Sequence, residues 1–286
     1  MKTGWLIVNP FLQGEKYANL YALLLQKAKK RGISLVLKRT DELVHIIGQR
    51  IPAPPEFAIF WDKDTRLAES MEVQGIPLFN NARAIALCDD KAKTAIALAK
   101  ADVPTPKTVL APKTFDTVGY NDLSFLEEAE NILSYPMIIK ENYGSFGAQV
   151  YLANNHTDAV EIILRLRHKP FIMQEYIQKS HGKDVRVNVV GGKVICSMLR
   201  ENTSDFRSNI SGGGKAKPYS LSDEQAKLAV DACKAVNADF AGVDILLGDI
   251  PLVCEVNSNP HFKSTLDCTG VDLSTHIFSY IEEKLS

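Results

Sequence analysis

Residues 241–260 read AGVDILLGDIPLVCEVNSNP, two apolar stretches joined by a short polar turn. Gly248 and Asp249 in that turn favour a hairpin. Each stretch carries one carboxylate among apolar residues, Asp244 in the first and Glu255 in the second. Because a buried carboxylate is costly unless it has a partner, the segment predicts two paired strands whose carboxylates meet a cation.

The spacing in the second strand favours a metal ion as that cation. Glu255 and Asn257 are two residues apart, so both side chains leave the same face of the strand, and Asp244 on the partner strand can face them. Carboxylate and amide oxygens suit Mg²⁺, or Mn²⁺, which also keeps substrate phosphates as ligands. We expect Asp244, Glu255 and Asn257 to be metal ligands. The alternative is a pair of strand-end carboxylates in salt bridges.

A turn containing glycines lies upstream of this hairpin. Lys140 ends the apolar stretch 137–140, and Gly144, Ser145 and Gly147 follow before the next apolar stretch. Backbone N–H groups in such a turn can converge on phosphate oxygens, and Lys140 would add a positive charge. The pattern is neither a Walker loop nor GxGxxG. A phosphate-binding loop and a plain hairpin turn both remain open from the residues alone.

The segment between these two features carries groups suited to a nucleoside. Residues 174–177 end a predicted strand with a hydrogen-bonding edge that could meet an adenine amine, and Asp184 could take ribose hydroxyls. Each of these can equally be a strand-end residue that faces water. Arg186 and Arg200 lie on neighbouring predicted strands. Residues 205–209 and the glycines at 212–214 form either a loop beside the substrate or a linker.

Length and composition limit the classes of protein. At roughly 150 residues per domain, 286 residues suggest about two domains. Lys+Arg is 33 and Asp+Glu is 34, a net charge of −1, which argues against a direct nucleic-acid binder. No run of 18 apolar residues predicts a membrane span. The five cysteines form no CxxC pair, which argues against a zinc site and a disulfide framework. We expect a cytoplasmic protein.

The order of predicted elements divides the chain into three parts. Strands at 5–9, 34–38 and 57–61 with a helix at 15–31 predict a small parallel α/β unit. A helix at 90–100 stops before the two prolines of 103–106. Beyond it, antiparallel strands are expected at 137–140, 149–152, 171–176, 184–190 and 193–199, with a hairpin turn at Gly191-Gly192, and helices at 158–167, 222–236 and 272–284. The fold class is α/β plus α+β, with domains 1–88, 89–175 (glycine loop) and 176–286 (metal site).

Six segments, taken in chain order, resemble the ATP-grasp superfamily of carboxylate–amine ligases. They are Asp90-Lys91, Ile139-Lys140, residues 174–177, residues 205–209, residues 241–246 and residues 255–260. The chain looks most like the RimK-type family, whose namesake adds glutamates to the C-terminus of a ribosomal protein. The likeness covers about residues 89 to 275, and residues 1–88 fit the family's preceding α/β domain only in general pattern. The resemblance implies an ATP-grasp fold whose two α+β subdomains grip ATP.

The resemblance also implies roles for individual residues. Lys91 and Lys140 would contact ATP phosphates, and the glycine loop would close over them. The nucleotide-binding set that it implies is Lys91, Lys140, Gly144, Ser145, Gly147, Gln174, Glu175, Tyr176, Ile177, Asp184, Arg207, Ser208 and Asn209. The metal set is Asp244, Glu255 and Asn257. Arg186, Arg200 or Arg207 would stabilise the transferring phosphoryl group or the tetrahedral oxyanion.

Two departures from the family pattern concern the lid and the substrate. Gln149 stands where the family loop usually has another glycine. After Pro260 the chain reads His261-Phe262-Lys263, where the ribosomal-protein ligase has small and acidic residues. Lys263 could bind a carboxylate substrate, or be a solvated loop lysine.

The implied reaction is ATP-driven amide formation through an acylphosphate, with ADP as product. We expect an amino-acid donor, glutamate favoured, and a carboxylate acceptor that is a peptide, a protein or a small molecule. One alternative is a dipeptide ligase resembling D-alanine–D-alanine ligase. Another is an ATP-binding module without turnover, as in synapsins. Related ligases are commonly oligomers, so a homo-oligomer is expected.

Overall fold

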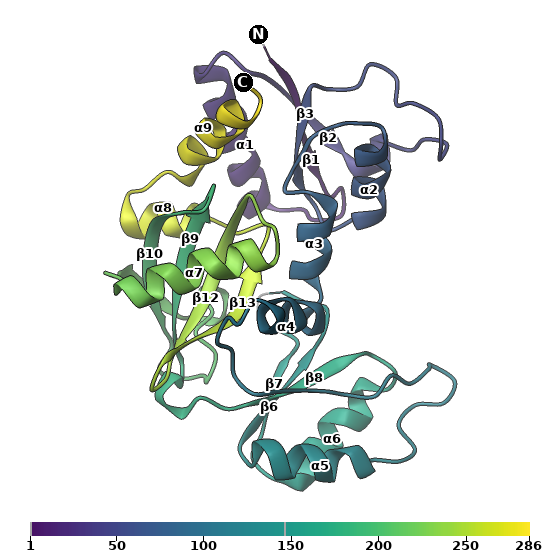
Figure 1. Ribbon diagram of the computed structural model, residues 1–286, viewed down its shortest axis with the longest axis vertical. Coiled ribbons are helices and arrows are strands. Elements are labelled where there is room, and N and C mark those ends of the chain that lie inside the picture. The colour runs from purple at the N-terminus through teal and green to yellow at the C-terminus, as the bar shows by residue number, and fades with distance from the viewer. Residues whose placement is uncertain (1, 146) are drawn as a thin grey trace.

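The computed structural model describes residues 2–145 and 147–286, and Phe146 of the glycine loop lies outside it. The described residues form three sheets, with strand orders β2-β1-β3-β4, β5-β8-β6-β7 and β11-β10-β9-β12-β13. Figure 1 shows three parts following one another along the long axis, with both chain ends at the same pole. The first sheet is parallel and the other two are antiparallel. The expected fold class, α/β plus α+β, is confirmed.

The N-terminal part is a parallel α/β unit. It comprises β1 (Thr3–Val8), α1 (Glu15–Lys30), β2 (Ser34–Arg39), the short η1 (Thr40–Glu42), β3 (Phe57–Trp61), α2 (Thr65–Val73), β4 (Leu78–Phe79) and α3 (Ala82–Asp89). Every residue of β3 is buried. A continuous apolar run is typical of a parallel strand that is covered on both faces. The structure adds α2, β4 and α3 to the elements that the sequence predicted.

The middle part has a core of its own. It comprises α4 (Lys91–Lys100), β5 (Thr108–Leu110), α5 (Ser124–Leu133), β6 (Met137–Glu141), β7 (Val150–Ala153), α6 (His156–Leu166) and β8 (Phe171–Glu175). The Asp90 carboxylate caps α4 by accepting from the N–H groups of Ala92 and Lys93. α5 and α6 lie together beyond the sheet (Figure 1), and their apolar faces join β6 and β8 in one cluster.

The C-terminal part carries the larger antiparallel sheet. It comprises η2 (Gln178–Ser180), β9 (Lys183–Val190), β10 (Lys193–Glu201), η3 (Ile210–Gly212), β11 (Lys215–Pro218), α7 (Asp223–Ala235), β12 (Phe240–Leu247), β13 (Pro251–Asn257), α8 (Lys263–Thr269) and α9 (Leu273–Lys284). Gly191 and Gly192 have φ of 56° and 73° between β9 and β10. Positive φ at both central residues is what a two-residue hairpin turn requires, so the predicted turn is confirmed.

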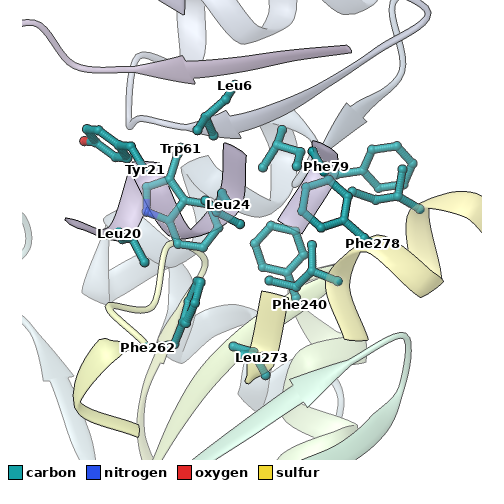
Figure 2. Packing of buried hydrophobic residues seen from close by; sticks show 14 of the residues in the cluster. Leu6, Leu20, Tyr21, Leu24, Trp61, Phe79, Phe240, Phe262, Leu273 and Phe278 are labelled. Carbon is teal, nitrogen blue, oxygen red and sulfur yellow. The ribbon is translucent and has the colours of Figure 1, made fainter. Parts of the chain in front are cut away.

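An aromatic core joins the two ends of the chain. Trp61 at the end of β3 stacks on Phe240, with ring centroids 5.5 Å apart, and meets Phe262 edge-on at 5.8 Å. Figure 2 shows these rings beside Phe278 of α9, between the parallel sheet and the C-terminal helices. The parallel unit is thereby fixed against the end of β13. Among the described residues, no helix is long and apolar enough to cross a membrane.

Candidate functional site

A cleft of about 900 Å³, counting the part that opens to solvent, lies between the two antiparallel sheets. Apolar and charged side chains line it together, as is typical of a small-molecule site. Most of the site residues expected from the sequence line it, and the two that do not are Arg186 and Asn257. The residues that it brings together are Lys91, Lys140, Gly144, Ser145, Gly147, Gln174, Glu175, Tyr176, Ile177, Asp184, Arg200, Arg207, Ser208, Asn209, Asp244 and Glu255.

Lys140 is a buried cation without an anionic partner. The residue is 7% exposed on β6. Its Nζ donates to Gln174 Oε1 at 2.6 Å and lies 3.4 Å from Cys254 Sγ, and both of these partners are neutral. None of the ion pairs found within residues 2–145 and 147–286 involves Lys140. Since a buried charge needs compensation, the position calls for an anion in the cleft.

Asp244, in contrast, is fully compensated by two arginines. Arg186 donates to both of its carboxylate oxygens, from Nη2 at 2.8 Å and from Nε. Arg200 Nη2 lies 2.9 Å from Oδ2. Burial alone would raise the pKa of Asp244, but Arg186 and then Arg200 lower it below its ordinary value. The carboxylate is therefore held ionised, in a fixed orientation, at the centre of the sheet.

Asp184 and Arg200 form a second buried pair beside it. Arg200 donates from Nε to Asp184 Oδ1 at 2.7 Å and from Nη2 to Oδ2 at 2.5 Å. Burial alone would lower the pKa of Arg200, and Asp244 and Asp184 raise it instead. Register explains the cluster: Arg200 pairs with Asp184 across β10 and β9, and Arg186, two residues on, pairs with Asp244 of β12. Arg186 and Arg200 thus frame two carboxylates.

A β-bulge re-aims the side chains of the acidic hairpin. Asp244 pairs with Glu255, but the next residue, Ile245, pairs with Val253, so Cys254 is the extra residue. Consecutive strand residues normally point to opposite faces, yet both Cys254 and Glu255 line the cleft. Strand periodicity does not predict the position of this thiol, because a bulge breaks the period of two.

The donor set beside the bulge fits a hard cation through oxygen atoms. Asn257 Nδ2 donates to the Gly242 carbonyl at 3.2 Å, which leaves its Oδ1 as an acceptor. Within the described part of the chain, the one ion pair of Glu255 is a distant one, to Lys91 Nζ at 3.9 Å. Asp244 would have to share its carboxylate with the arginines. No group of three or more His, Cys, Asp or Glu side chains suited to a metal occurs in the described part of the chain, so a metal set here would need the amide oxygen of Asn257, which does not line the cleft.

The glycine loop is tied down by side chains from both sheets. Gln149 Oε1 accepts from the Ser145 N–H at 3.2 Å and lies where a Cβ on Gly144 would stand. Arg207 Nη1 donates to the Gly147 carbonyl at 2.8 Å, while Asp205 holds the same guanidinium. Gln149, which departs from the family pattern, therefore fills the space over Gly144. The loop bridges the two sheets at the mouth of the cleft.

The end of the cleft expected to hold a nucleoside is formed by β8 and the residues after it. The Gln174 amide is already occupied, since it accepts from Lys140 and donates to Thr108 Oγ1 at 2.8 Å. One of the two Nε2 hydrogens is thus already used within the protein. The carboxylate of Glu175 accepts from the Lys107 N–H at 2.9 Å. An adenine contact at 174–177 and a ribose contact at Asp184 remain predictions.

Several lining residues were not predicted, and a period-of-two count would have found some of them. Ile138 precedes Lys140 by two residues on β6, and Leu246 follows Asp244 by two on β12. The others are Gln149, Val150, Ser180, Lys183, Phe206 and Cys254. Lys263 lies outside the cleft lining, where its Nζ pairs with Asp267, and His261 Nε2 lies 3.1 Å from the Lys16 carbonyl.

Comparison with known proteins agrees with this geometry. The sequence model described as the RimK-like ATP-grasp domain matches residues 88–281. The chain belongs to the RimK-like ATP-grasp family. A probable alpha-L-glutamate ligase of Legionella pneumophila (strain Corby) is 34% identical over 224 residues, 77% of this chain and 72% of that protein.

Two mammalian relatives of this RimK-like chain are longer. N-acetylaspartylglutamate synthase A of Homo sapiens is 32% identical over 253 residues, 87% of this chain and 62% of that protein. Beta-citrylglutamate synthase B of Mus musculus is 32% identical over 258 residues, 86% of this chain and 64% of that protein. The chain thus spans a little under two thirds of the length of these two relatives.

Solved structures confirm the ATP-grasp fold of the RimK-like chain. The RimK domain ATP-grasp protein of Sphaerobacter thermophilus DSM 20745 matches with a TM-score of 0.75 at 19% identity, over 97% of this chain and 98% of the other. D-alanine–D-alanine ligase from Bacillus anthracis, solved with ATP, gives 0.76 at 19%, over 100% and 97%. ATP-grasp ligase PsnB, solved with Mg and ADP, gives 0.74 at 19%, over 99% and 98%. At this identity the likeness concerns the fold.

Proposed function

We propose that this protein is an ATP-dependent ligase that joins a carboxylate to the amino group of glutamate, with ADP and phosphate as products. The observation that carries the proposal is Lys140, a buried cation that has no anionic partner among the described residues. It lies in a cleft that also holds Glu255 and Arg207. The negative charges of a polyphosphate ligand would compensate such a buried cation. We infer glutamate as the amine substrate because the names of all three relatives include it. The two synthases differ in the acyl group that is joined to glutamate.

The reaction proceeds in two steps. The substrate carboxylate attacks the γ-phosphorus of ATP, the bond to the β–γ bridging oxygen breaks, and an acylphosphate and ADP form. The deprotonated amine then attacks the acyl carbon and expels inorganic phosphate. In total, one carboxylate, one ammonium ion and ATP give one amide, ADP, phosphate and one proton.

The chain's own residues contribute positioning and charge. Lys140 and Lys91 flank the strand end and the glycine loop, where they would neutralise phosphate oxygens. Arg207 couples the loop to the opposite sheet through Gly147. Arg186 and Arg200 hold Asp244 in place. Direct action of these two arginines on the phosphoryl group stays a prediction, because both are engaged by carboxylates.

Glu255, Asn257 and Asp244 are the residues that would hold Mg²⁺ or Mn²⁺. Such an ion, when bound, offsets the repulsion between the attacking carboxylate and the phosphates. We expect Glu255→Gln to lower turnover about a hundredfold or more, as losses of single electrostatic contacts in active sites do. The matched control is Glu224→Gln on the first turn of α7. A near-normal rate in the Glu255 variant would remove this residue from the metal set.

The experiment that tests the function uses purified protein, ATP, Mg²⁺ and glutamate with each of several carboxylates. N-acetylaspartate, citrate and a peptide with a free C-terminus represent the acyl parts to compare. Mass spectrometry detects the amide, and ADP is measured in parallel. An amide that contains glutamate supports the proposal. Dipeptides of other amino acids would favour a dipeptide ligase, and tight ATP binding without ADP in these mixtures and in cell extract would favour a binding module.

A further inference from the structure

A carboxylate outside the ATP cleft has a buried oxygen without a hydrogen-bond partner. Asp62, directly after β3, is 5% exposed. Its Oδ1 accepts from Asn9 Nδ2 at 3.2 Å and from the Lys63 N–H at 2.5 Å. Its Oδ2 has no hydrogen-bond partner among the described residues. Orphaned acceptors of this kind are uncommon in folded proteins and point to an absent donor.

A second orphaned acceptor lies beside it. Asn259 follows β13 by two residues, and its Nδ2 donates to the Asp62 carbonyl at 2.9 Å. Its Oδ1 is also buried without a partner among the described residues. The pair therefore offers two acceptors and one negative charge. None of the ion pairs among the described residues involves Asp62.

The topology of the parallel sheet marks the same place. In the strand order β2-β1-β3-β4, β2 lies on one side of β1, and β3 and β4 lie on the other. The direction in which strands are added reverses there, so the topological switch point lies between β1 and β3. Ligands of open parallel sheets bind outside the carboxyl ends of the strands at such a point. Asn9 follows β1 and Asp62 follows β3, and their side-chain hydrogen bond spans the crevice between the two strands.

This place adjoins the ATP cleft on two sides. Lys63, next to Asp62, donates from Nζ to Ser145 Oγ of the glycine loop at 3.2 Å. Asn259 extends the strand that carries Glu255 and Asn257. The segment 11–14, which follows Asn9, is exposed to solvent beside this place. A group held at Asp62 would thus stand between the lid and the metal strand.

We propose that Asp62 and Asn259 bind the ammonium group of the amine substrate. An ammonium group brings three N–H donors and one positive charge, which match two orphaned acceptors and one uncompensated carboxylate. The inference rests on the proposed ligase function, because that function requires an amine. Burial, with Asp64 adding to it, raises the pKa of Asp62, and hydrogen bonds from Asn9 and the backbone oppose that shift. A bound cation would remove this cost of burial.

The test compares two ligands that differ only in the amino group. Glutamate and glutarate are titrated into the full chain loaded with Mg²⁺ and a non-hydrolysable ATP analogue, and affinity is measured by calorimetry. The wild type should prefer glutamate by about tenfold or more, the size of one charge-assisted contact. Asp62→Asn should abolish that preference and leave glutarate binding unchanged. The control is Asp64→Asn, which removes the same charge two residues away and keeps the exposed cap of α2. It should change neither the preference for glutamate nor the affinity for glutarate.

Stability separates a binding role from a structural one. Asp62→Asn keeps the size and one acceptor of the side chain, so the melting temperature without ligand should be unchanged or higher. A lower melting temperature with an intact preference for glutamate would overturn the inference. If Asp62→Asn does not fold, Asn259→Ala is compared instead, and it should reduce the same preference.

The same measurements distinguish failure of the ammonium site from failure of the proposed function. If the wild type does not bind glutamate, the other amino acids are tested, each against its deaminated acid. Loss of an observed preference in Asp62→Asn would then support the ammonium site while glutamate is rejected as donor. A wild type that prefers no amine over its deaminated acid, or a preference that survives in Asp62→Asn, would overturn the inference. Binding of Mg²⁺ alone that depends on Asp62 would identify a metal site and also overturn it.

Discussion

Lys140 and Arg200 are both buried cations that line the cleft, and they differ in whether carboxylates compensate their charge. Lys140 has neutral partners, Gln174 and Cys254. Arg200 contacts two carboxylates, Asp184 and Asp244. An uncompensated charge lowers the stability of the empty protein and favours binding of an anion, whereas a compensated one holds its partners in place. Lys140 is therefore suited to bind substrate, and Arg200 to position Asp244.

Replacing Lys140 by Met should separate binding from stability. The change keeps the length of the side chain and removes the charge, so the dissociation constant for ATP should rise about ten- to a hundredfold, the value of one charge-assisted contact. The free energy of unfolding should not fall. Calorimetry with ATP and urea unfolding measure the two quantities. Lys193→Met, on the exposed end of β10, is the control. Unchanged ATP affinity in Lys140→Met would reject its phosphate role.

Replacing Arg200 by Met should destabilise the fold in a pH-dependent way. It leaves Asp184 unpaired in the interior, so the free energy of unfolding at pH 7 should fall by about 3–5 kcal/mol. The folded-state pKa of Asp244 is lowered, so its contribution is present above the unfolded pKa and lost as the pH falls through the folded value. Urea unfolding should therefore show the wild-type advantage shrinking below about pH 4. A difference independent of pH would contradict the ionic explanation.

At the scale of elements, alternation and turn chemistry account for what the sequence predicted. β3 and the turn at Gly191 and Gly192 lie where local pattern placed them. β4 has two residues and α3 has eight, and elements this short give too little periodicity to detect. The cleft lining at Cys254 depends on a bulge, which only the pairing with β12 defines. Local signals therefore predicted most elements and most of the site, and pairing between strands set the rest.

Blocking the contact between the glycine loop and the opposite sheet should weaken the binding of ATP. Gly147 has φ +75°, and a Cβ there would stand 2.5 Å from Asn209 Oδ1. Gly147→Ala should therefore raise the dissociation constant for ATP about tenfold or more, since loop and sheet cannot close together. Gly48→Ala is the matched control, because φ is +88° and no atom lies within 4 Å of the added Cβ. It should cost about 1 kcal/mol of stability and leave ATP binding intact. Equal ATP affinity in both variants would contradict the closure argument.

At the scale of the whole molecule, the first and last parts of the chain share one core, and residues 126–173 of the middle part form another. Leu6 and Trp61 pack with Phe240 and Phe278, whereas the middle cluster contains no residue from either end. The predicted division at residues 88 and 175 follows local composition, which carries no information about contacts between residues nearly 200 positions apart. Such pairing is set by tertiary packing, so the sequence did not predict it.

Two core substitutions should consequently give different unfolding curves. Both tryptophans, Trp5 and Trp61, lie in the parallel unit. Trp61 belongs to the shared core and Trp5 packs on the other cluster of that unit, so fluorescence reports on both. Phe278→Ala should lower the free energy of unfolding seen by fluorescence by about 3–5 kcal/mol, since it empties a fully buried ring site. Phe171→Ala removes an equally buried ring from the middle cluster. It should leave the fluorescence transition in place and add an earlier step to the circular-dichroism transition. If Phe171→Ala shifted both signals together, the middle part would share one cooperative unit with the ends, and closure of the cleft would require deformation of a single core instead of movement between two.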